Sequence, residues 1–82
     1  MPKDITVYTS NNCAYCVMVK KYLTMKGAEY SEINIEEQPE HQQKMMDISG
    51  QSRVPVTVVT NQDGSQDVSV GYNLTKLSAA IG

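Results

Sequence analysis

The sequence predicts an α/β fold in which a four-stranded mixed sheet is flanked by three helices. Segments with the two-residue period of strands alternate with segments of helical period, in the order strand, helix, strand, helix, strand, strand, helix. The opening strand–helix–strand run implies a parallel pair with a right-handed crossover, and the turn at residues 61–64 implies an antiparallel hairpin. With 82 residues and no repeat or linker, residues 1–82 are expected to form a single domain.

The first strand and the first helix meet at the two cysteines. Ile5 to Tyr8 has the pattern of a short strand, residues 9–12 form a polar turn, and residues 14–26 form a helix. The predicted apolar arc of this helix consists of Cys16, Met18, Val19, Tyr22, Leu23 and Met25. Gly27 is suited to the left-handed position that ends a helix.

The middle of the chain is expected to supply a second strand and a second helix. Ala28 to Ile35 is the predicted strand, although its alternation is imperfect. Residues 36–40 have the features of a helix entrance, because acidic side chains favour the positive end of a helix and Pro39 is tolerated in a first turn. This helix is predicted to run to about Ser49, where Gly50 ends it.

The last part of the chain predicts a hairpin and a third helix. Val54 to Thr60 is apolar on both faces, which is typical of a central strand covered on both sides. Residues 67–70 alternate polar residues with valines, which predicts an edge strand with the valines inward and the polar face in solvent. Asn73 is a good N-cap for a helix over residues 74–81.

The composition excludes several classes of function. A hydrophobic content of 40% with 20% charged residues is typical of globular proteins, and the net charge is −2 without a basic cluster that could bind nucleic acid. No apolar run has the length of a membrane span, and the first residues lack the apolar stretch of a signal peptide. We therefore expect a cytoplasmic monomer that binds neither nucleic acid nor membranes, in a compartment that keeps thiols reduced.

The segment Cys13-Ala14-Tyr15-Cys16 carries both cysteines at the start of the first predicted helix. Two thiols three residues apart lie about one helical turn from each other, so they can form a small disulfide. Such a disulfide closes too short a loop to restrain the unfolded chain, which favours a reactive role over a stabilising one. The unpaired N–H groups of the helix start should lower the pKa of the Cys13 thiol below the free value of about 8.5.

Several motifs along the whole chain resemble those of the glutaredoxins, the small branch of the thioredoxin fold. The matching motifs are Val7-Tyr8-Thr9, Cys13-Ala14-Tyr15-Cys16, Ser49-Gly50, Val54-Pro55 and Gly71-Tyr72-Asn73. The resemblance implies a dithiol thiol–disulfide oxidoreductase that reduces protein or small-molecule disulfides, with Cys13 attacking and Cys16 resolving. It also implies a cis peptide bond before Pro55, with the backbone of Val54 pairing with the substrate.

The electron donor is left open by departures from the family pattern. Glutathione-using members usually have a Gly-Gly turn followed by an acidic residue before the last helix, where this chain has Val70-Gly71-Tyr72-Asn73. They also tend to have a basic residue before the cysteines, and residues 10–12 offer none. The turn is instead similar to that of NrdH-type redoxins, many of which take electrons from thioredoxin reductase. Thioredoxin reductase and glutathione as a co-substrate are thus the two candidate donors, and no bound cofactor is expected.

A further set of residues is expected to contact the substrate. This set consists of Tyr15, Arg53, Val54, Pro55, Gly71, Tyr72 and Asn73. Arg53 would either meet a carboxylate or remain a solvated loop residue, and Asn73 would cap the last helix or contact a ligand. Tyr15 is expected to pack its ring over the rim of the site. Val17 and Met18 would either dock a partner protein or be buried beneath the neighbouring loop.

A metal-binding module is the alternative to a redox enzyme. Some glutaredoxins hold an iron–sulfur cluster between two chains with glutathione as a co-ligand, and the absence of proline after Cys13 is compatible with this. Only Cys13 would then be a ligand from each chain. A structural zinc site requires four ligands, whereas this chain offers two cysteines and the remote His41, so no metal site is expected.

Overall fold

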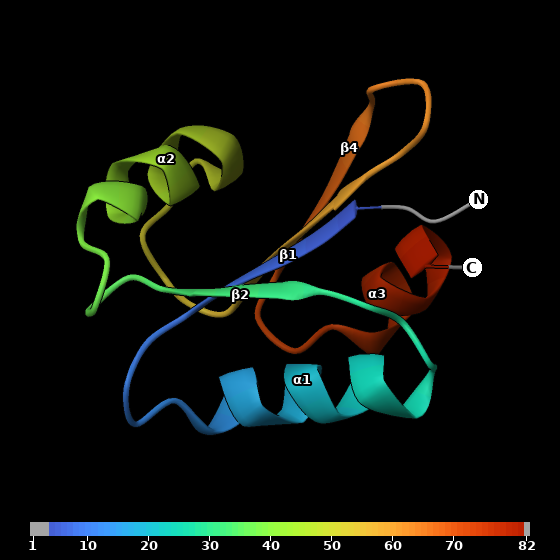
Figure 1. Ribbon diagram of the computed structural model, residues 1–82, viewed down its shortest axis with the longest axis horizontal. Helices are drawn as coiled ribbons and strands as arrows, with labels where there is room; N and C mark the ends of the chain where they lie inside the picture. Colours follow the sequence, from blue (N-terminus) through green and yellow to red (C-terminus); the bar gives the residue numbers. More distant parts are fainter. Residues whose placement is uncertain (1–3, 82) are drawn as a thin grey trace.

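The computed structural model describes residues 4–81, and its elements follow the predicted order. They are β1 (Asp4–Thr9), α1 (Ala14–Met25), β2 (Ser31–Asn34), α2 (Glu40–Ser49), β3 (Val56–Thr60), β4 (Gln66–Val70) and α3 (Leu74–Ile81). The sheet has the order β2-β1-β3-β4, with β1 parallel to β2 and with antiparallel β1–β3 and β3–β4 pairs (Figure 1). The predicted four-stranded mixed sheet with three helices is confirmed. Across residues 4–81, no helix has the length and apolar character to cross a membrane.

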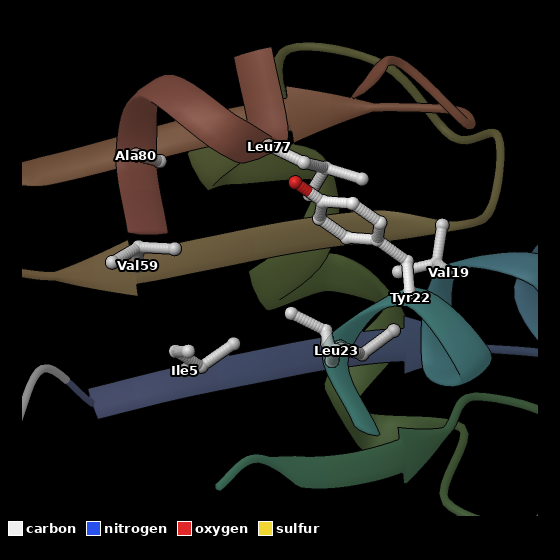
Figure 2. Packing of buried hydrophobic residues seen from close by; sticks show 8 residues of the cluster. Ile5, Val19, Tyr22, Leu23, Val59, Leu77 and Ala80 are labelled. Carbon is white, nitrogen blue, oxygen red and sulfur yellow. The ribbon is translucent and has the colours of Figure 1, made fainter. Parts of the chain in front are cut away.

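The sheet separates two hydrophobic clusters. Helices α1 and α3 cover one face and α2 covers the other (Figure 1). The larger cluster, between the sheet and α1 and α3, contains Ile5, Val7, Val19, Tyr22, Leu23, Val59, Leu77 and Ala80 (Figure 2). The smaller cluster, on the side of α2, contains Tyr8, Ile35, Met45, Val56 and Val58. Neighbouring residues of one strand, such as Val7 and Tyr8, thus enter different clusters because successive side chains point to opposite faces.

The predicted C-terminal ends of α1 and α2 and the predicted N-cap of α3 are confirmed. Gly27 after α1 has a φ of 71° and Gly50 after α2 has a φ of 74°, the left-handed conformation in which glycine is favoured. At the start of α3, the side-chain oxygen of Asn73 accepts a hydrogen bond from the backbone N–H of Lys76 at 3.2 Å. Asn73 is therefore the N-cap of this helix.

Four predicted boundaries are too wide, and the first of them is the start of β2, which lies at Ser31 rather than at Ala28. The segment before α2 is a turn, because the side-chain oxygen of Asn34 accepts from the N–H of Glu36 at 2.9 Å and holds the chain in a non-helical path. As a result β2 ends at Asn34, and α2 begins only after Pro39. Strand β3 begins at Val56 rather than at Val54, because Pro55 has no N–H to donate and Val54 has no partner for its peptide groups among the described residues.

Two expectations about burial are wrong. Met18 and Met25 do not extend the buried arc of α1, since they are 40% and 73% exposed and lie outside the arc that faces the sheet. In β4, Ser69 is only 2% exposed and Val70 is 40% exposed, which reverses the predicted pattern for these two residues. Helix α3 packs against β4 and covers the face that was expected to meet solvent.

Candidate functional site

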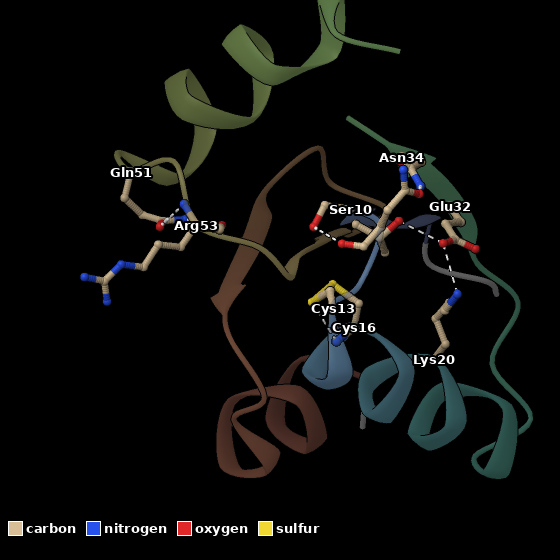
Figure 3. The surroundings of a disulfide bond; sticks show 10 residues. Ser10, Cys13, Cys16, Lys20, Glu32, Asn34, Gln51 and Arg53 are labelled. Atoms are coloured by element: carbon tan, nitrogen blue, oxygen red, sulfur yellow. Dashed lines mark hydrogen bonds and ion pairs between the residues drawn. A yellow bond between two sulfur atoms is a disulfide. The ribbon is translucent and has the colours of Figure 1, made fainter. Parts of the chain in front are cut away.

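The two cysteines lie where the chain passes from β1 into α1. Strand β1 ends at Thr9, a short turn follows, and Cys13 takes the N-cap position with an extended backbone. Cys13 and Cys16 form a disulfide, with their Cα atoms 5.3 Å apart (Figure 3). The strand-to-helix connection thus fixes the separation that thiol–disulfide chemistry requires.

The helix start provides the electrostatic environment of Cys13. The backbone N–H of Cys16 donates a hydrogen bond to the sulfur of Cys13 at 3.1 Å, and the first turn of α1 contains no acidic residue. An N–H donor at the positive end of a helix favours the thiolate form of a cysteine. The two sulfurs also differ in access, because Cys13 is half-buried and Cys16 is only 2% exposed.

A cavity of about 490 Å³ opens beside the disulfide. Its wall is formed by Ser10, Asn12, Cys13, Ala14, Cys16, Val17 and Lys20. Among these lining residues only Lys20 is charged, and its ammonium forms a 3.0 Å ion pair with Glu32 of β2. The hydroxyl of Thr9 donates to the same carboxylate at 2.8 Å, and the hydrogen bonds from Thr9 and Lys20 together lower the pKa of Glu32. Thr9, Lys20 and Glu32 therefore tie α1 to β1 and β2 next to the cysteines.

The loop before β3 carries two of the other predicted site residues, Val54 and Pro55. The Val54–Pro55 peptide bond is cis, as the resemblance implies. The carbonyl of Pro55 accepts a 2.7 Å hydrogen bond from the N–H of Gly71, which has a φ of 76°. The structure therefore brings the predicted residue Gly71 next to the predicted pair Val54 and Pro55, which lies in an earlier part of the sequence.

The remaining predicted contact residues are either exposed to solvent or used within the fold. Tyr15 is 61% exposed, so most of its ring lies in solvent instead of packing over the rim. Arg53 is exposed, and Figure 3 shows its guanidinium pointing away from the disulfide. Tyr72 packs against the larger hydrophobic cluster, and Asn73 caps α3.

The apolar residues after the cysteines are in solvent. Val17 is 46% exposed and Met18 is 40% exposed, so burial beneath the neighbouring loop, one of the two alternatives, is wrong. The other alternative, contact with a partner protein, stays a prediction.

Comparisons with known proteins give one consistent answer. The sequence profile of the Glutaredoxin family matches residues 5–63, which is more than half of the chain. The glutaredoxin-like protein NrdH of Lactococcus lactis is 42% identical over 53 residues, which cover 65% of this chain and 74% of that protein. An uncharacterized glutaredoxin-like 8.6 kDa protein from the rubredoxin operon of Clostridium pasteurianum is 30% identical over 77 residues, covering 94% of this chain and 96% of that one. This chain belongs to the glutaredoxin family.

The same assignment follows from solved structures. The crystal structure of a glutaredoxin from Archaeoglobus fulgidus matches with a TM-score of 0.80 and 27% identity, over 96% of this chain and 86% of that chain. The family and the cysteine pair at disulfide distance give this glutaredoxin-like redoxin a thiol–disulfide redox function. Its fold is the glutaredoxin form of the thioredoxin fold.

Two features of this glutaredoxin-like site were not found from the sequence. No pattern in the sequence indicates a partner for Lys20, and the structure pairs it with Glu32 of β2. Gln51 gave no signal in the sequence, but its side chain bonds to the backbone of Arg53 on both sides. Contacts between distant elements leave no local pattern in the sequence. The only sequence signal for the Lys20 contact is its position four residues after Cys16, which places it one helical turn away from that cysteine.

Within residues 4–81, no three side chains of the His, Cys, Asp and Glu types lie close enough together to form a metal site. In the described chain, Cys13 and Cys16 are bonded to each other in a disulfide.

Proposed function

We propose that this protein is a dithiol electron carrier in which Cys13 attacks the substrate disulfide and Cys16 resolves the mixed disulfide. The observation that carries the proposal is the difference between the two sulfurs. Cys13 is accessible and accepts the N–H of Cys16 at 3.1 Å, whereas Cys16 is buried beneath it with 2% exposure. An attacking thiol must reach the substrate, but a resolving thiol needs to reach only its partner.

The reaction balances as two thiol–disulfide exchanges. The Cys13 thiolate forms a bond with one substrate sulfur, the substrate S–S bond breaks, and the other substrate sulfur leaves as a thiolate that takes up a proton. Cys16 then loses its proton and attacks the Cys13 sulfur, which releases the second substrate thiol and forms the Cys13–Cys16 disulfide. Two electrons pass from the protein to the substrate, and the disulfide seen in the structure corresponds to the product state.

We further propose that the donor is a thioredoxin reductase rather than glutathione. The position of the acidic residue that glutathione-using members carry is taken by Asn73, whose side chain is already used to cap α3. Residues 10–12 contribute no cation next to the cysteines. The NrdH protein of Lactococcus lactis is also among the relatives of this chain. Substrates in this proposal are disulfide-containing proteins, and the protein acts as a cytoplasmic, single-domain monomer.

The donor can be tested by following NADPH oxidation during reduction of a small disulfide. One reaction contains thioredoxin reductase, and the other contains glutathione with glutathione reductase. We expect faster turnover with thioredoxin reductase and none with a Cys13→Ser variant in either reaction. Faster turnover with glutathione would reverse the assignment of the donor, while no turnover in both reactions, with chemically reduced protein also inactive, would contradict the proposed redox function itself.

A further inference from the structure

In the loop between α2 and β3, the side chain of Gln51 makes the two backbone hydrogen bonds that a neighbouring strand would otherwise make. The side-chain oxygen of Gln51 accepts a hydrogen bond from the N–H of Arg53, and the side-chain nitrogen of Gln51 donates to the carbonyl of Arg53 at 2.9 Å (Figure 3). One residue therefore has both of its peptide groups bonded to a single amide. Hydrogen-bonded residues of antiparallel strands exchange the same two bonds.

The Gln51 amide is itself held from α2. Its nitrogen lies 3.2 Å from the hydroxyl oxygen of Ser49, and this hydroxyl donates to the carbonyl of Met45 at 2.7 Å. The amide nitrogen has two protons, one for Arg53 and one for Ser49, and the amide oxygen accepts the N–H of Arg53. Only one orientation of the amide satisfies all three contacts, so the side chain is fixed with respect to the end of the helix.

Between these anchors lies a residue whose peptide groups remain open. Across residues 4–81, neither the N–H nor the carbonyl of Val54 has a hydrogen-bond partner. Arg53 before it is held by Gln51, and Pro55 after it is held by the N–H of Gly71 at 2.7 Å. The backbone is thus fixed on both sides of Val54, whose own peptide groups can still pair with another chain.

We propose that Gln51 is a positioning residue, which orients the open peptide groups of Val54 for pairing with the backbone of a peptide substrate. The inference rests on the proposed function, in which Cys13 attacks the substrate disulfide, and on the pairing of Val54 with the substrate that the resemblance to glutaredoxins implies. It predicts that the protein prefers disulfides carried by a peptide to small disulfides that lack amide groups. Pairing between backbones gives more affinity when the accepting segment is already ordered, because less conformational entropy is lost on binding.

The test compares two disulfides that differ only in the presence of a peptide. Both are 2-thiopyridyl mixed disulfides, one of an uncharged peptide with a central cysteine and the other of 2-mercaptoethanol. The chemically reduced protein reacts with each, and release of pyridine-2-thione gives a second-order rate constant. Gln51→Met removes both hydrogen bonds at nearly constant size, and Gln42→Met, on the exposed side of α2, is the matched control.

For Gln51→Met we expect the rate constant with the peptide disulfide to fall about tenfold. In this variant the backbone of about one residue must be ordered during binding, and the entropy lost in this step corresponds to about a tenfold change. The rate constant with the mercaptoethanol disulfide and the rate of Cys13 alkylation by iodoacetamide should stay within about twofold, as they lack the backbone pairing. Gln42→Met should leave both rate constants unchanged.

The outcomes separate the inference from the proposed function. Equal loss with both disulfides, or no loss with either, would overturn the positioning role of Gln51. A wild-type protein that reacts with neither disulfide would instead contradict the proposed function. If Gln51→Met does not fold, Gln51→Glu decides, because it keeps the acceptor for the Arg53 N–H and loses the two donated hydrogen bonds, to the Arg53 carbonyl and to the Ser49 hydroxyl. A smaller but still peptide-selective loss in Gln51→Glu would support the role, and an unselective loss would overturn it.

Discussion

The two sides of the candidate site are built by different kinds of interaction. On the side of α1, Cys13 and Cys16 are held by regular secondary structure, and their helix packs into the larger hydrophobic cluster through Val19 and Leu23. On the opposite side, Val54 lies in a loop outside β3, and its neighbours are held by the Gln51 side chain and by one bond to Gly71. The first side depends on core packing, and the second depends on a few individual hydrogen bonds.

This difference separates reactivity from selection of the substrate. The helix start sets the access and the electrostatic surroundings of the Cys13 sulfur, and any disulfide that reaches it meets the same thiol. In the proposed role, the open peptide groups of Val54 would pair with the peptide that a substrate carries beside its disulfide. Substitutions on the side of α1 should therefore change the rates with all substrates together, whereas substitutions in the loop should change the preference among substrates.

The largest effect is expected for the cysteines themselves. Cys13→Ser should lower the rate of disulfide reduction by about 10³-fold or more, because the attacking sulfur is lost. Cys16→Ser should still attack, and it should accumulate a mixed disulfide between Cys13 and the substrate that mass spectrometry detects. If Cys16→Ser accumulated no adduct while Cys13→Ser did, the two roles would be exchanged.

The next effect concerns the packing that carries α1. Leu23 is fully buried, so Leu23→Ala should lower the free energy of unfolding by about 2–5 kcal/mol through lost burial and a residual cavity. Denaturant unfolding measures the change. Met25→Ala on the same helix is the control, since Met25 is 73% exposed and should change stability by less than about 0.5 kcal/mol. Similar losses in both variants would show that α1 is not anchored through this face.

The side of α1 was also the part that the sequence predicted best. Alternating strands, helical spacing and the two cysteines are local patterns, and they placed Cys13 at a helix start with Cys16, Val19 and Leu23 on the buried face. The resemblance to glutaredoxins added the cis bond before Pro55. These features depend on residues close in the chain or on motifs shared by a family.

The loop side could not be predicted in the same way. The bonds of Gln51 to Arg53 depend on the path of an irregular loop, and a glutamine in a loop has no periodic pattern. The exposure of Val70 and the burial of Ser69 depend on how α3 packs over β4, which the alternation within β4 does not report. Tertiary contacts of this kind override the local period.

Two buried threonines on the α1 side of the sheet should respond in opposite directions to the same substitution. Thr9 is 1% exposed and donates to Glu32, while Thr57 is fully buried and its hydroxyl has no partner within the described chain. Thr9→Val should cost about 1 kcal/mol because a hydrogen bond to a carboxylate is lost, and Thr57→Val should gain up to about 1 kcal/mol because an unpaired buried hydroxyl is removed. Thermal unfolding of the two variants gives the comparison. Destabilisation of similar size in both would mean that the Thr57 hydroxyl has a partner after all.

The smallest effect is expected for the ion pair beside the cavity. The pKa of Glu32 is lowered by its hydrogen bonds to Thr9 and Lys20, so the folded protein binds this proton less tightly than the unfolded chain does. Its contribution to stability is therefore present above the unfolded value of about 4.5 and is lost as the pH falls through the lower folded value. Both side chains are about one third exposed, so the contribution should be below about 1 kcal/mol.

Glu32→Gln measures this contribution directly. The free energy of unfolding of the variant should be lower than that of the wild type at pH 7, and the difference should shrink as the pH falls below about 4.5, where the wild-type carboxylate also becomes neutral. A difference that stays constant between pH 7 and pH 3 would show that Glu32 acts through packing and not through its charge. Reduction of the mercaptoethanol and peptide disulfides should then change in parallel, because this pair supports the α1 side of the site, which acts on every substrate alike.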